Sequence, residues 1–261
     1  FDFLPDGGLL ITERAGTLLH VAPDGTRTSV SGVPEVAARG QGGLLDITLA
    51  RDFDQSRRAF MTYAKPQGGR GAGTALASAT LSADAQSLSN LKLLFEMKPG
   101  NRGGAHFGSR VVEAEDGTLF VTVGERQQPD LAQDLDQHNG TVVRVTRDGN
   151  VPADNPFVGQ QGALPHIWSY GHRNPQGAAL DARGRLWVNE HGARGGDEVN
   201  LIEKGANYGW PVISYGRQYS GGKIGVGTEK EGMKQPAHYW DPSIAPSGMM
   251  FYEGNMFRDW Q

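Results

Sequence analysis

The chain has 261 residues, a net charge of −4 at pH 7 and no cysteine. A slightly acidic chain without a basic patch is a poor candidate for binding nucleic acid, and no apolar run approaches the roughly 18 residues of a membrane-spanning helix. The lack of cysteine excludes disulfides, thiolate metal sites and thiol nucleophiles. With 38 glycines and 14 prolines, the composition favours many turns over long helices.

Both ends of the chain lie inside recognisable strand and turn patterns. The chain opens with Phe-Asp-Phe-Leu-Pro-Asp-Gly at residues 1–7, without an initiator methionine or a signal peptide, and stops at residues 257–261. Its length is sufficient for a large core in one domain. We therefore expect a single domain over residues 1–261 that is truncated at both ends.

One short pattern recurs along the chain and indicates the architecture. Each copy is a tight turn that opens a buried strand rich in β-branched and aromatic residues. Successive copies start roughly 50 to 70 residues apart, which suits four-stranded propeller blades with variable loops. We therefore expect an all-β propeller of about four blades plus the start of a fifth. The copies lie at residues 6–13, 57–63, 116–123 and 183–190, and the fifth begins at 247–252.

Helical periodicity is not sustained over ten or more residues in most of the chain. Residues 83–94 are the only weak candidate for a helix. This agrees with the all-β interpretation.

The first residue of chemical interest is Gln41, which two glycines follow directly. A glutamine amide offers two donors and one acceptor to a polar ligand. The same pattern also fits a loop residue without a role, and the pattern alone favours that interpretation.

A second centre is His106, which lies among glycines just before the strand expected at residues 111–112. A neutral imidazole can take the proton of an alcohol that is being oxidised, provided that a carboxylate orients the ring. Glu125, after the next expected strand (119–123), is placed to be that carboxylate. A single histidine is more often structural than catalytic, so the residues alone leave both interpretations open.

The densest group of reactive side chains surrounds a short apolar run at residues 186–188. Arg173, Asn174 and Gln176 come before the run and form a donor-rich cluster. A charged cluster with interspersed glycines follows it, and such glycines let backbone groups approach a ligand or an ion. On composition alone the stretch equally fits a charged loop between strands. The second cluster contains Glu190, His191, Gly192, Arg194, Asp197 and Glu198.

Four motifs in this region resemble, in order and spacing, the signature of the soluble pyrroloquinoline-quinone (PQQ) dependent sugar dehydrogenases, most closely their bacterial aldose sugar dehydrogenase branch. The likeness extends over the whole chain. That family folds as a six-bladed β-propeller, so the resemblance implies that more than one blade lies outside this chain. The motifs are Gly-His-Arg-Asn-Pro-Gln-Gly at 171–177, Glu-His-Gly at 190–192, Asp-Glu at 197–198 and Asn-Tyr-Gly-Trp-Pro at 207–211.

The resemblance implies a catalytic group of three residues. His106 matches the family's His-x-x-x-Arg motif and would be the base that takes the sugar hydroxyl proton. Glu125 stands where the family often has aspartate, which keeps the carboxylate but lengthens its reach. Arg173 would stabilise the reduced quinone, a task that suits a planar and always charged guanidinium. PQQ carries three carboxylates and needs a donor-rich site, which the resemblance assigns to Gln41, Arg173, Asn174 and Gln176.

The resemblance also implies two calcium sites. The carbonyls of Gly192 and Ala193 occupy the positions of the family's Gly-Pro ligands for Ca²⁺ on the quinone, where alanine in place of proline loosens the turn. Glu198 and the carbonyl of Tyr208 match a second, structural Ca²⁺ site. Carboxylate and carbonyl oxygens are the ligands that Ca²⁺ prefers.

The resemblance implies a PQQ- and Ca²⁺-dependent oxidoreductase, periplasmic or secreted, that oxidises aldoses at C1 to lactones by base-assisted hydride transfer and passes electrons to an acceptor. Two other classes stay open, and the sequence gives no oligomeric state. One is a calcium-dependent hydrolase of lactonase type, which needs acids that converge from several blades. Only Glu13, Glu125 and Glu190 end a repeat with an acid. The other is a propeller that binds a sugar or another ligand without catalysis.

Overall fold

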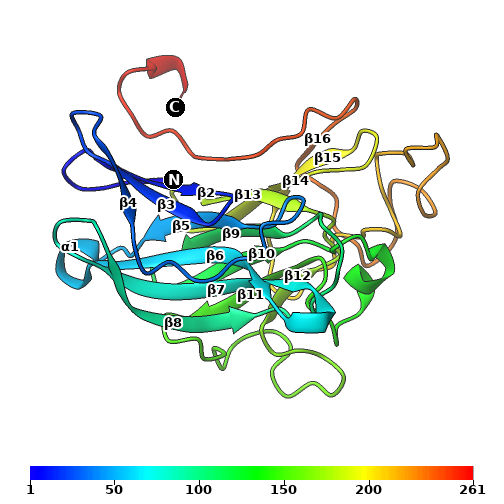
Figure 1. The fold of residues 1–261 in the computed structure, drawn as a ribbon. Coiled ribbons are helices and arrows are strands. Elements are labelled where there is room, and N and C mark those ends of the chain that lie inside the picture. The colour runs from blue at the N-terminus through cyan, green and yellow to red at the C-terminus, as the bar shows by residue number, and fades with distance from the viewer. Residues whose placement is uncertain (261) are drawn as a thin grey trace.

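In the computed structural model, which describes residues 1–260, the chain forms four separate sheets of four strands (Figure 1). Within each sheet every strand pairs antiparallel with its neighbour in the chain, so each sheet is an up-and-down meander. Four such sheets in chain order are the blades of a β-propeller, as the repeated turn and strand pattern predicts. The all-β propeller prediction, with four blades over this chain, is confirmed.

The blades follow the chain from the N-terminus, and their bounds are as follows. Blade one contains β1 (Asp2–Phe3), β2 (Leu9–Glu13), β3 (Thr17–Val21) and β4 (Arg27–Val30). Blade two contains β5 (Leu44–Leu49), β6 (Arg58–Pro66), β7 (Ala72–Leu81) and β8 (Leu88–Glu96). Blade three contains β9 (Gly108–Glu113), β10 (Thr118–Val123), β11 (Thr141–Thr146) and β12 (Ile167–Tyr170). Blade four contains β13 (Pro175–Leu180), β14 (Leu186–Glu190), β15 (Asp197–Leu201) and β16 (His238–Trp240).

Helical structure is limited to single turns between or after the strands. The longest helix in the described residues, η2, has five residues, so no helix there could cross a bilayer. The helical turns are α1 (Phe53–Ser56), η1 (Gly68–Arg70), η2 (Pro129–Gln133) and η3 (Arg258–Trp260).

The repeated sequence pattern marks the second strand of each blade. In blades one, three and four the pattern's glycine forms the hairpin turn before β2, β10 and β14. These glycines, Gly7, Gly117 and Gly184, have φ values of 87°, 78° and 71°. That left-handed conformation is accessible to glycine without a steric penalty, which explains why the turn residue recurs. In blade two the turn contains α1, and Arg57 takes the left-handed conformation instead.

The blades are held together by apolar side chains that pack between neighbouring sheets. One buried cluster joins blades one and two, a second joins two and three, and a third joins three and four. Val142 and Val143 are consecutive in β11 and belong to different clusters, because successive side chains of a strand point to opposite faces. Each buried valine or leucine stabilises the fold by about 1.5–3 kcal/mol relative to exposure.

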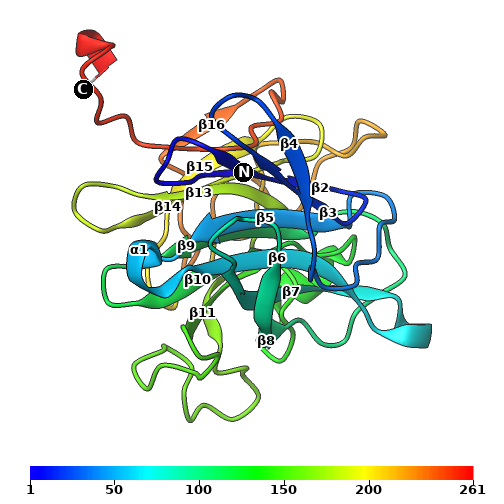
Figure 2. The ribbon, with the colours of Figure 1, turned by 60° about the vertical axis from the view of Figure 1, so that its left-hand side comes forward.

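The first strand of each blade lies nearest the centre of the molecule. Figures 1 and 2 show β5, β9 and β13 side by side there, and β9 packs against both of the others. Loops that precede these strands therefore meet at one end of a central channel. This arrangement brings residues from distant parts of the sequence together.

Two segments differ in detail from their sequence patterns. The weak helix candidate at residues 83–94 is wrong, because Leu88–Glu96 is strand β8 and pairs with β7. Residues 247–252 have no assigned strand, although they lie beside β13.

Candidate active site

His106 and Glu125 form a hydrogen-bonded pair at the end of blade three. His106 precedes β9 and Glu125 follows β10, and because these strands are antiparallel neighbours the two residues lie at one edge. His106 Nδ1 lies 2.6 Å from Glu125 Oε1. The second Glu125 oxygen accepts the amide of Gln128 at 2.8 Å, which fixes the carboxylate. The His106 side chain stays 14% exposed, and its Nε2 makes no hydrogen bond among the described residues.

Gln41 lies directly against the backbone of His106. The side-chain Oε1 of Gln41 accepts a hydrogen bond from the His106 backbone amide at 2.7 Å, and the backbone amide of Gln41 donates to the Gly104 carbonyl at 2.6 Å. Gly40 allows this approach, because a Cβ there would lie 2.2 Å from the Gly104 carbonyl oxygen. The loop that carries Gln41 therefore packs on the loop that carries His106.

Asn174 and Gln176 lie across a cavity from Gln41. The Asn174 side-chain oxygen accepts the Gly108 amide at 3.2 Å and the Gln176 side-chain amide at 2.9 Å. The cavity has a volume of about 250 Å³. Three of the four residues expected to bind the cofactor therefore share one cavity. Its lining is Gln41, Leu45, Phe107, Gly108, Asn174, Gln176 and His191.

Arg173, the fourth expected cofactor residue, points toward the neighbouring loop. Its guanidinium donates to the Gly192 carbonyl and, at 3.1 Å, to the His191 carbonyl, and it lies 5.3 Å from the Trp210 ring. The Tyr219 hydroxyl is 3.4 Å from the guanidinium. The Nε of Arg173 is buried without a hydrogen-bond partner among the described residues.

A second histidine and carboxylate pair, His172 and Glu190, lies behind Arg173. His172 Nδ1 is 2.8 Å from Glu190 Oε1, and Glu190 Oε2 accepts the Arg173 amide at 2.6 Å. Ser169 Oγ is 3.0 Å from His172 Nε2, but the whole group is buried and closed to a substrate. Its role is to hold Arg173. Sequence reasoning missed this pair, although its 18-residue separation nearly repeats the 19 residues between His106 and Glu125.

Two of the three acids that end a repeat are thus engaged with histidines. Glu125 and Glu190 each orient an imidazole rather than converging on one ion. Within residues 1–260 no group of three histidine, cysteine or acidic side chains is arranged to hold a metal.

Glu198 and Glu190 face each other in β15 and β14. Burial, and then the nearby charge of Glu190, raise the pKa of Glu198 to about 8. The Asn200 side-chain amide donates to both carboxylates, at 3.1 and 3.3 Å, while its Oδ1 is buried without a partner among the described residues. Two facing carboxyl groups beside an unpartnered amide oxygen offer the hard oxygen ligands that Ca²⁺ prefers.

The other expected calcium ligands, Gly192, Ala193 and Tyr208, line two separate cavities. Gly192 and Tyr208 line a small cavity of about 10 Å³ with Glu198, which is the space of one water or ion. Ala193 lines a separate cavity of about 560 Å³ with Tyr219. Glu198 and Tyr208, expected to share one site, therefore line the same cavity, whereas Gly192 lies with them and not in the cavity of Ala193, its expected partner.

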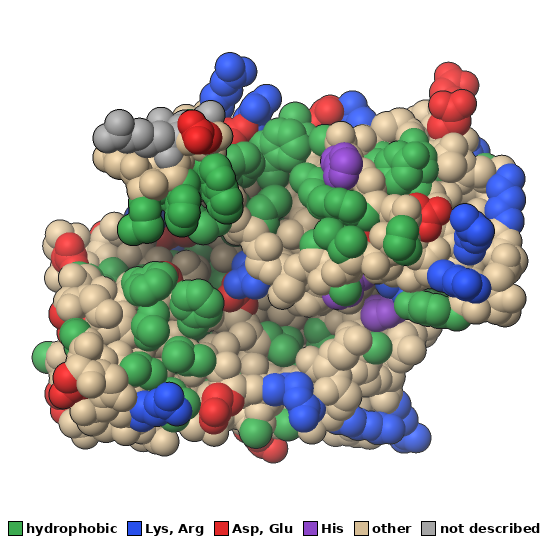
Figure 3. Space-filling view, turned by 90° about the horizontal axis from the view of Figure 1, so that it is seen from above, with side chains coloured by type: hydrophobic (Ala, Val, Ile, Leu, Met, Phe, Trp, Pro, Cys, Tyr) green, Lys and Arg blue, Asp and Glu red, His purple; other side chains and the backbone are tan. Residues whose placement is uncertain are grey.

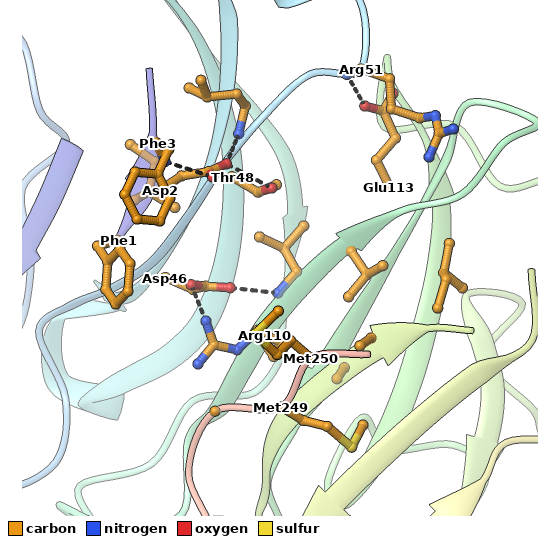
Figure 4. Close-up of a pocket in the computed structure, with 18 of the residues that line it drawn as sticks. Phe1, Asp2, Phe3, Asp46, Thr48, Arg51, Arg110, Glu113, Met249 and Met250 are labelled. Carbon is orange, nitrogen blue, oxygen red and sulfur yellow. Dashed lines mark hydrogen bonds and ion pairs between the residues drawn. The ribbon is translucent and has the colours of Figure 1, made fainter. Parts of the chain in front are cut away.

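The cavity that Gln41, Asn174 and Gln176 line continues into a wider channel along the innermost strands. An intermediate cavity of about 180 Å³ shares Leu45 and Gln176 with the upper one, and it shares Asp46 and Arg110 with a lower hollow of about 870 Å³. Figure 4 shows Arg110 and Asp46 pointing toward each other in this lower hollow, which Met250 also lines. Figure 3, which views the molecule from above relative to Figure 1, shows a hollow with hydrophobic side chains around it.

The sequence and the fold match known proteins along the whole chain. The sequence profile of the family described as Glucose / Sorbosone dehydrogenase matches residues 1–261. Aldose sugar dehydrogenase YliI of Escherichia coli K12 is 48% identical over 99% of this chain and 71% of its own length. The crystal structure of soluble aldose sugar dehydrogenase from Escherichia coli in the apo form has a TM-score of 0.96 at 46% identity, covering 99% of this chain and 76% of that one. The PQQ-bound aldose sugar dehydrogenase of Streptomyces coelicolor has a TM-score of 0.77 at 30% identity, covering 94% and 68%.

Proposed function

Because the chain belongs to the soluble PQQ-dependent sugar dehydrogenases, we propose that it oxidises aldoses at C1 to lactones with PQQ and Ca²⁺. The observation that carries the proposal is the partly exposed His106, held by Glu125 at 2.6 Å and by Gln41 through its backbone. This group stands beside the cavity that Asn174 and Gln176 line. A base next to a polar cavity is the arrangement that oxidation of an alcohol requires.

His106 takes the proton of the C1 hydroxyl on its Nε2. Glu125 accepts a hydrogen bond from Nδ1–H, which keeps the Nε2 lone pair free and stabilises the imidazolium after proton transfer. The carboxylate is nearly buried, at 2% exposure, so water screens this contact weakly. When bound, PQQ supplies the ortho-quinone that takes up the two electrons of the reaction.

The residues around the cavity fit a polyanionic quinone. The side-chain amide nitrogens of Gln41 and Asn174 make no hydrogen bond among the described residues and face a polar cavity. The unpartnered Nε of Arg173 adds a charged donor nearby. Hydrogen bonds from an ionised donor are about twice as strong as neutral ones, so Arg173 would contribute most to holding a carboxylate or quinone oxygen.

The calcium part of the proposal rests on two groups of oxygens. Glu198, the free Asn200 Oδ1 and the Tyr208 carbonyl would hold a structural ion, which would relieve the repulsion between the two buried glutamates. The Gly192 carbonyl would contribute to an ion at the cofactor, together with Ala193. The first group has the stronger support, because Arg173 already donates to the Gly192 carbonyl.

Two further parts of the proposal come from the family resemblance. An electron acceptor must reoxidise the cofactor, and the protein would act in the periplasm or outside the cell. Osmotic-shock fractionation of cells that express the full-length protein would test the location, and retention in the spheroplasts would contradict it.

The test of the function is aldose-dependent reduction of an artificial dye by full-length protein loaded with PQQ and Ca²⁺. We expect a lactone product, no dye reduction without PQQ, and much slower dye reduction with His106→Gln. Protein that binds PQQ but never reduces it would be a binding propeller. Hydrolysis of lactones with Ca²⁺ alone would instead indicate a hydrolase.

A further inference from the structure

Arg126 follows Glu125 directly and is one of the largest fully buried side chains, with 0% exposure. Nearly all buried arginines pair with a carboxylate or satisfy several backbone carbonyls, because a buried cation without partners is strongly unfavourable. Burial lowers the pKa of Arg126 to about 10, so the side chain remains charged at neutral pH. A buried charge so near the proposed base calls for a specific function.

The guanidinium of Arg126 binds the loop that carries His106. It donates to the carbonyls of Ala105 and, at 2.7 Å, Gly103, and it reaches the Ala72 carbonyl at 3.4 Å. Its centre lies 3.4 Å above the Phe107 ring, which is within the range of a cation–π contact. The residues immediately before and after His106 are therefore both held by one side chain.

The backbone around this contact is strained. His106 has a φ of 56° and Arg126 a φ of 60°, which are uncommon conformations for residues other than glycine. The Arg126 amide also donates to the His106 carbonyl at 3.3 Å. Strain of this kind persists only where surrounding contacts hold it, and it is concentrated at functional sites.

The same loop also positions Gln41. The backbone amide of Gln41 donates to the carbonyl of Gly104. Gly104 lies between Gly103 and Ala105, the two loop residues whose carbonyls Arg126 binds. The Gln41 side chain in turn accepts the amide of His106. Fixing residues 103–105 thus fixes both the base and a residue of the cofactor cavity.

We propose that Arg126 is a positioning residue for the proposed dehydrogenase reaction, and that it acts by holding the 103–107 loop so that His106 faces Glu125. The inference rests on the proposed function. It assigns no contact between Arg126 and the substrate or cofactor. Displacement of a catalytic group by about 1 Å lowers rates by about 10²-fold, which sets the size of the expected effect.

The test uses Arg126→Met in full-length protein, with Arg126→Lys as the conservative variant. Arg126→Met should lower kcat by about 10²-fold, and this loss should exceed any change in KM or in the PQQ dissociation constant, because Gln41 is only one of the four proposed cofactor residues. Arg126→Lys keeps the charge and one donor group, so it should recover part of the rate. In the His106→Gln background, Arg126→Met should lower the rate no further, because the effect runs through His106.

A matched control is Arg144→Met, which removes another buried arginine of the same blade. Arg144 bonds to Asp116 and Asp154 away from the loop, so its loss should lower stability and leave kcat unchanged. A purely structural role for Arg126 would give the same result as this control, and that outcome would overturn the proposal.

Nuclear magnetic resonance of ¹⁵N-histidine-labelled protein without PQQ supplies a readout independent of activity. The Nδ1 proton that His106 shares with Glu125 should be observed in the parent and in Arg144→Met, and lost or shifted in Arg126→Met. If Arg126→Met does not fold, Arg126→Lys decides, because a parental His106 signal together with parental kcat would overturn the inference. Failure of dye reduction in the parent would reject the proposed function and leave this test intact.

Discussion

His106 and His172 occupy equivalent positions in blades three and four, and each places Nδ1 on a glutamate from the end of its blade's second strand, at 2.6 and 2.8 Å. They differ in access, because the His106 side chain is 14% exposed and that of His172 is fully buried. The buried pair supports Arg173, whereas the exposed pair can reach a ligand. One repeated structural unit therefore serves two purposes in adjacent blades.

His106→Gln should lower kcat of full-length, PQQ-loaded protein by about 10²–10⁴-fold, the usual loss for a general base. PQQ affinity should stay close to that of the parent, because the proposed cofactor residues are Gln41, Arg173, Asn174 and Gln176, and Gln41 contacts only the backbone amide of residue 106. Stopped-flow reduction of the bound cofactor by an aldose, together with a binding titration, measures both quantities.

The matched control is His172→Gln, the same substitution in the buried pair. It loses the stacking of the ring on Tyr208 and at least one buried hydrogen bond, so the free energy of unfolding should fall by about 1–3 kcal/mol. His106→Gln should leave this free energy nearly unchanged. Parental turnover in His106→Gln would place the base elsewhere.

Arg173→Lys should lower turnover more than it weakens PQQ binding. Lysine keeps the charge but loses the planar guanidinium, whose Nη1 now donates to the carbonyls of both His191 and Gly192, and it has no counterpart of the unpartnered Nε. The measurements are kcat and the PQQ dissociation constant of full-length protein. The control is Arg185→Lys, because Arg185 is an exposed arginine that forms an ion pair with Asp181. Unchanged turnover in Arg173→Lys would remove this side chain from the mechanism.

The blades could be predicted from the sequence because their signals are local. Gly117 and Gly184 lie in tight turns that need a left-handed residue, and an apolar strand follows each of them directly. The contact between His106 and Glu125 could be expected for the same reason, since two neighbouring antiparallel strands bring their ends together. These inferences need only the hairpin geometry.

Other parts of the site depend on contacts between segments far apart in the chain. The separation of Ala193 from the cavity that Gly192 lines and the turn of Arg173 toward Gly192 follow from how a loop folds back, which no periodicity shows. No motif or periodicity marks Arg126, and its burial against Phe107 is visible only in the structure. Packing determined these positions.

Calcium should raise the thermal stability of the protein through Glu198. An ion that binds only the folded state at a concentration of 100 times its dissociation constant adds about 2.7 kcal/mol. Glu198→Gln removes the carboxylate ligand with little change in size, so the calcium-dependent rise in Tm should disappear. The exposed Glu203→Gln variant is the control. An equal calcium effect in both variants would exclude a site at Glu198.

Acid should destabilise the protein through the buried His138. Both ring nitrogens of His138 lack a hydrogen-bond partner among the described residues, and its ring lies 5.5 Å from that of His166. Burial, and then the neighbouring His166, lower the pKa of His138 from 6.5 to about 3. As the pH falls below 6.5 the unfolded chain binds a proton that the folded protein does not, so stability decreases until about pH 3, by at most about 1.4 kcal/mol per pH unit.

His138→Phe should remove this acid sensitivity, because phenylalanine fills a similar volume beside Phe95 and cannot take up a proton. Between pH 6.5 and pH 5 the parent should lose up to about 2 kcal/mol through His138, and the variant should lose less by that amount. Urea unfolding at both pH values measures the difference. The control is His238→Phe at an exposed position, which leaves the buried His138 in place, so its acid loss should match that of the parent. An equal loss in His138→Phe and the parent would show that the His138 ring is protonated in the folded state or reached by water, and the pH dependence would then belong to other groups.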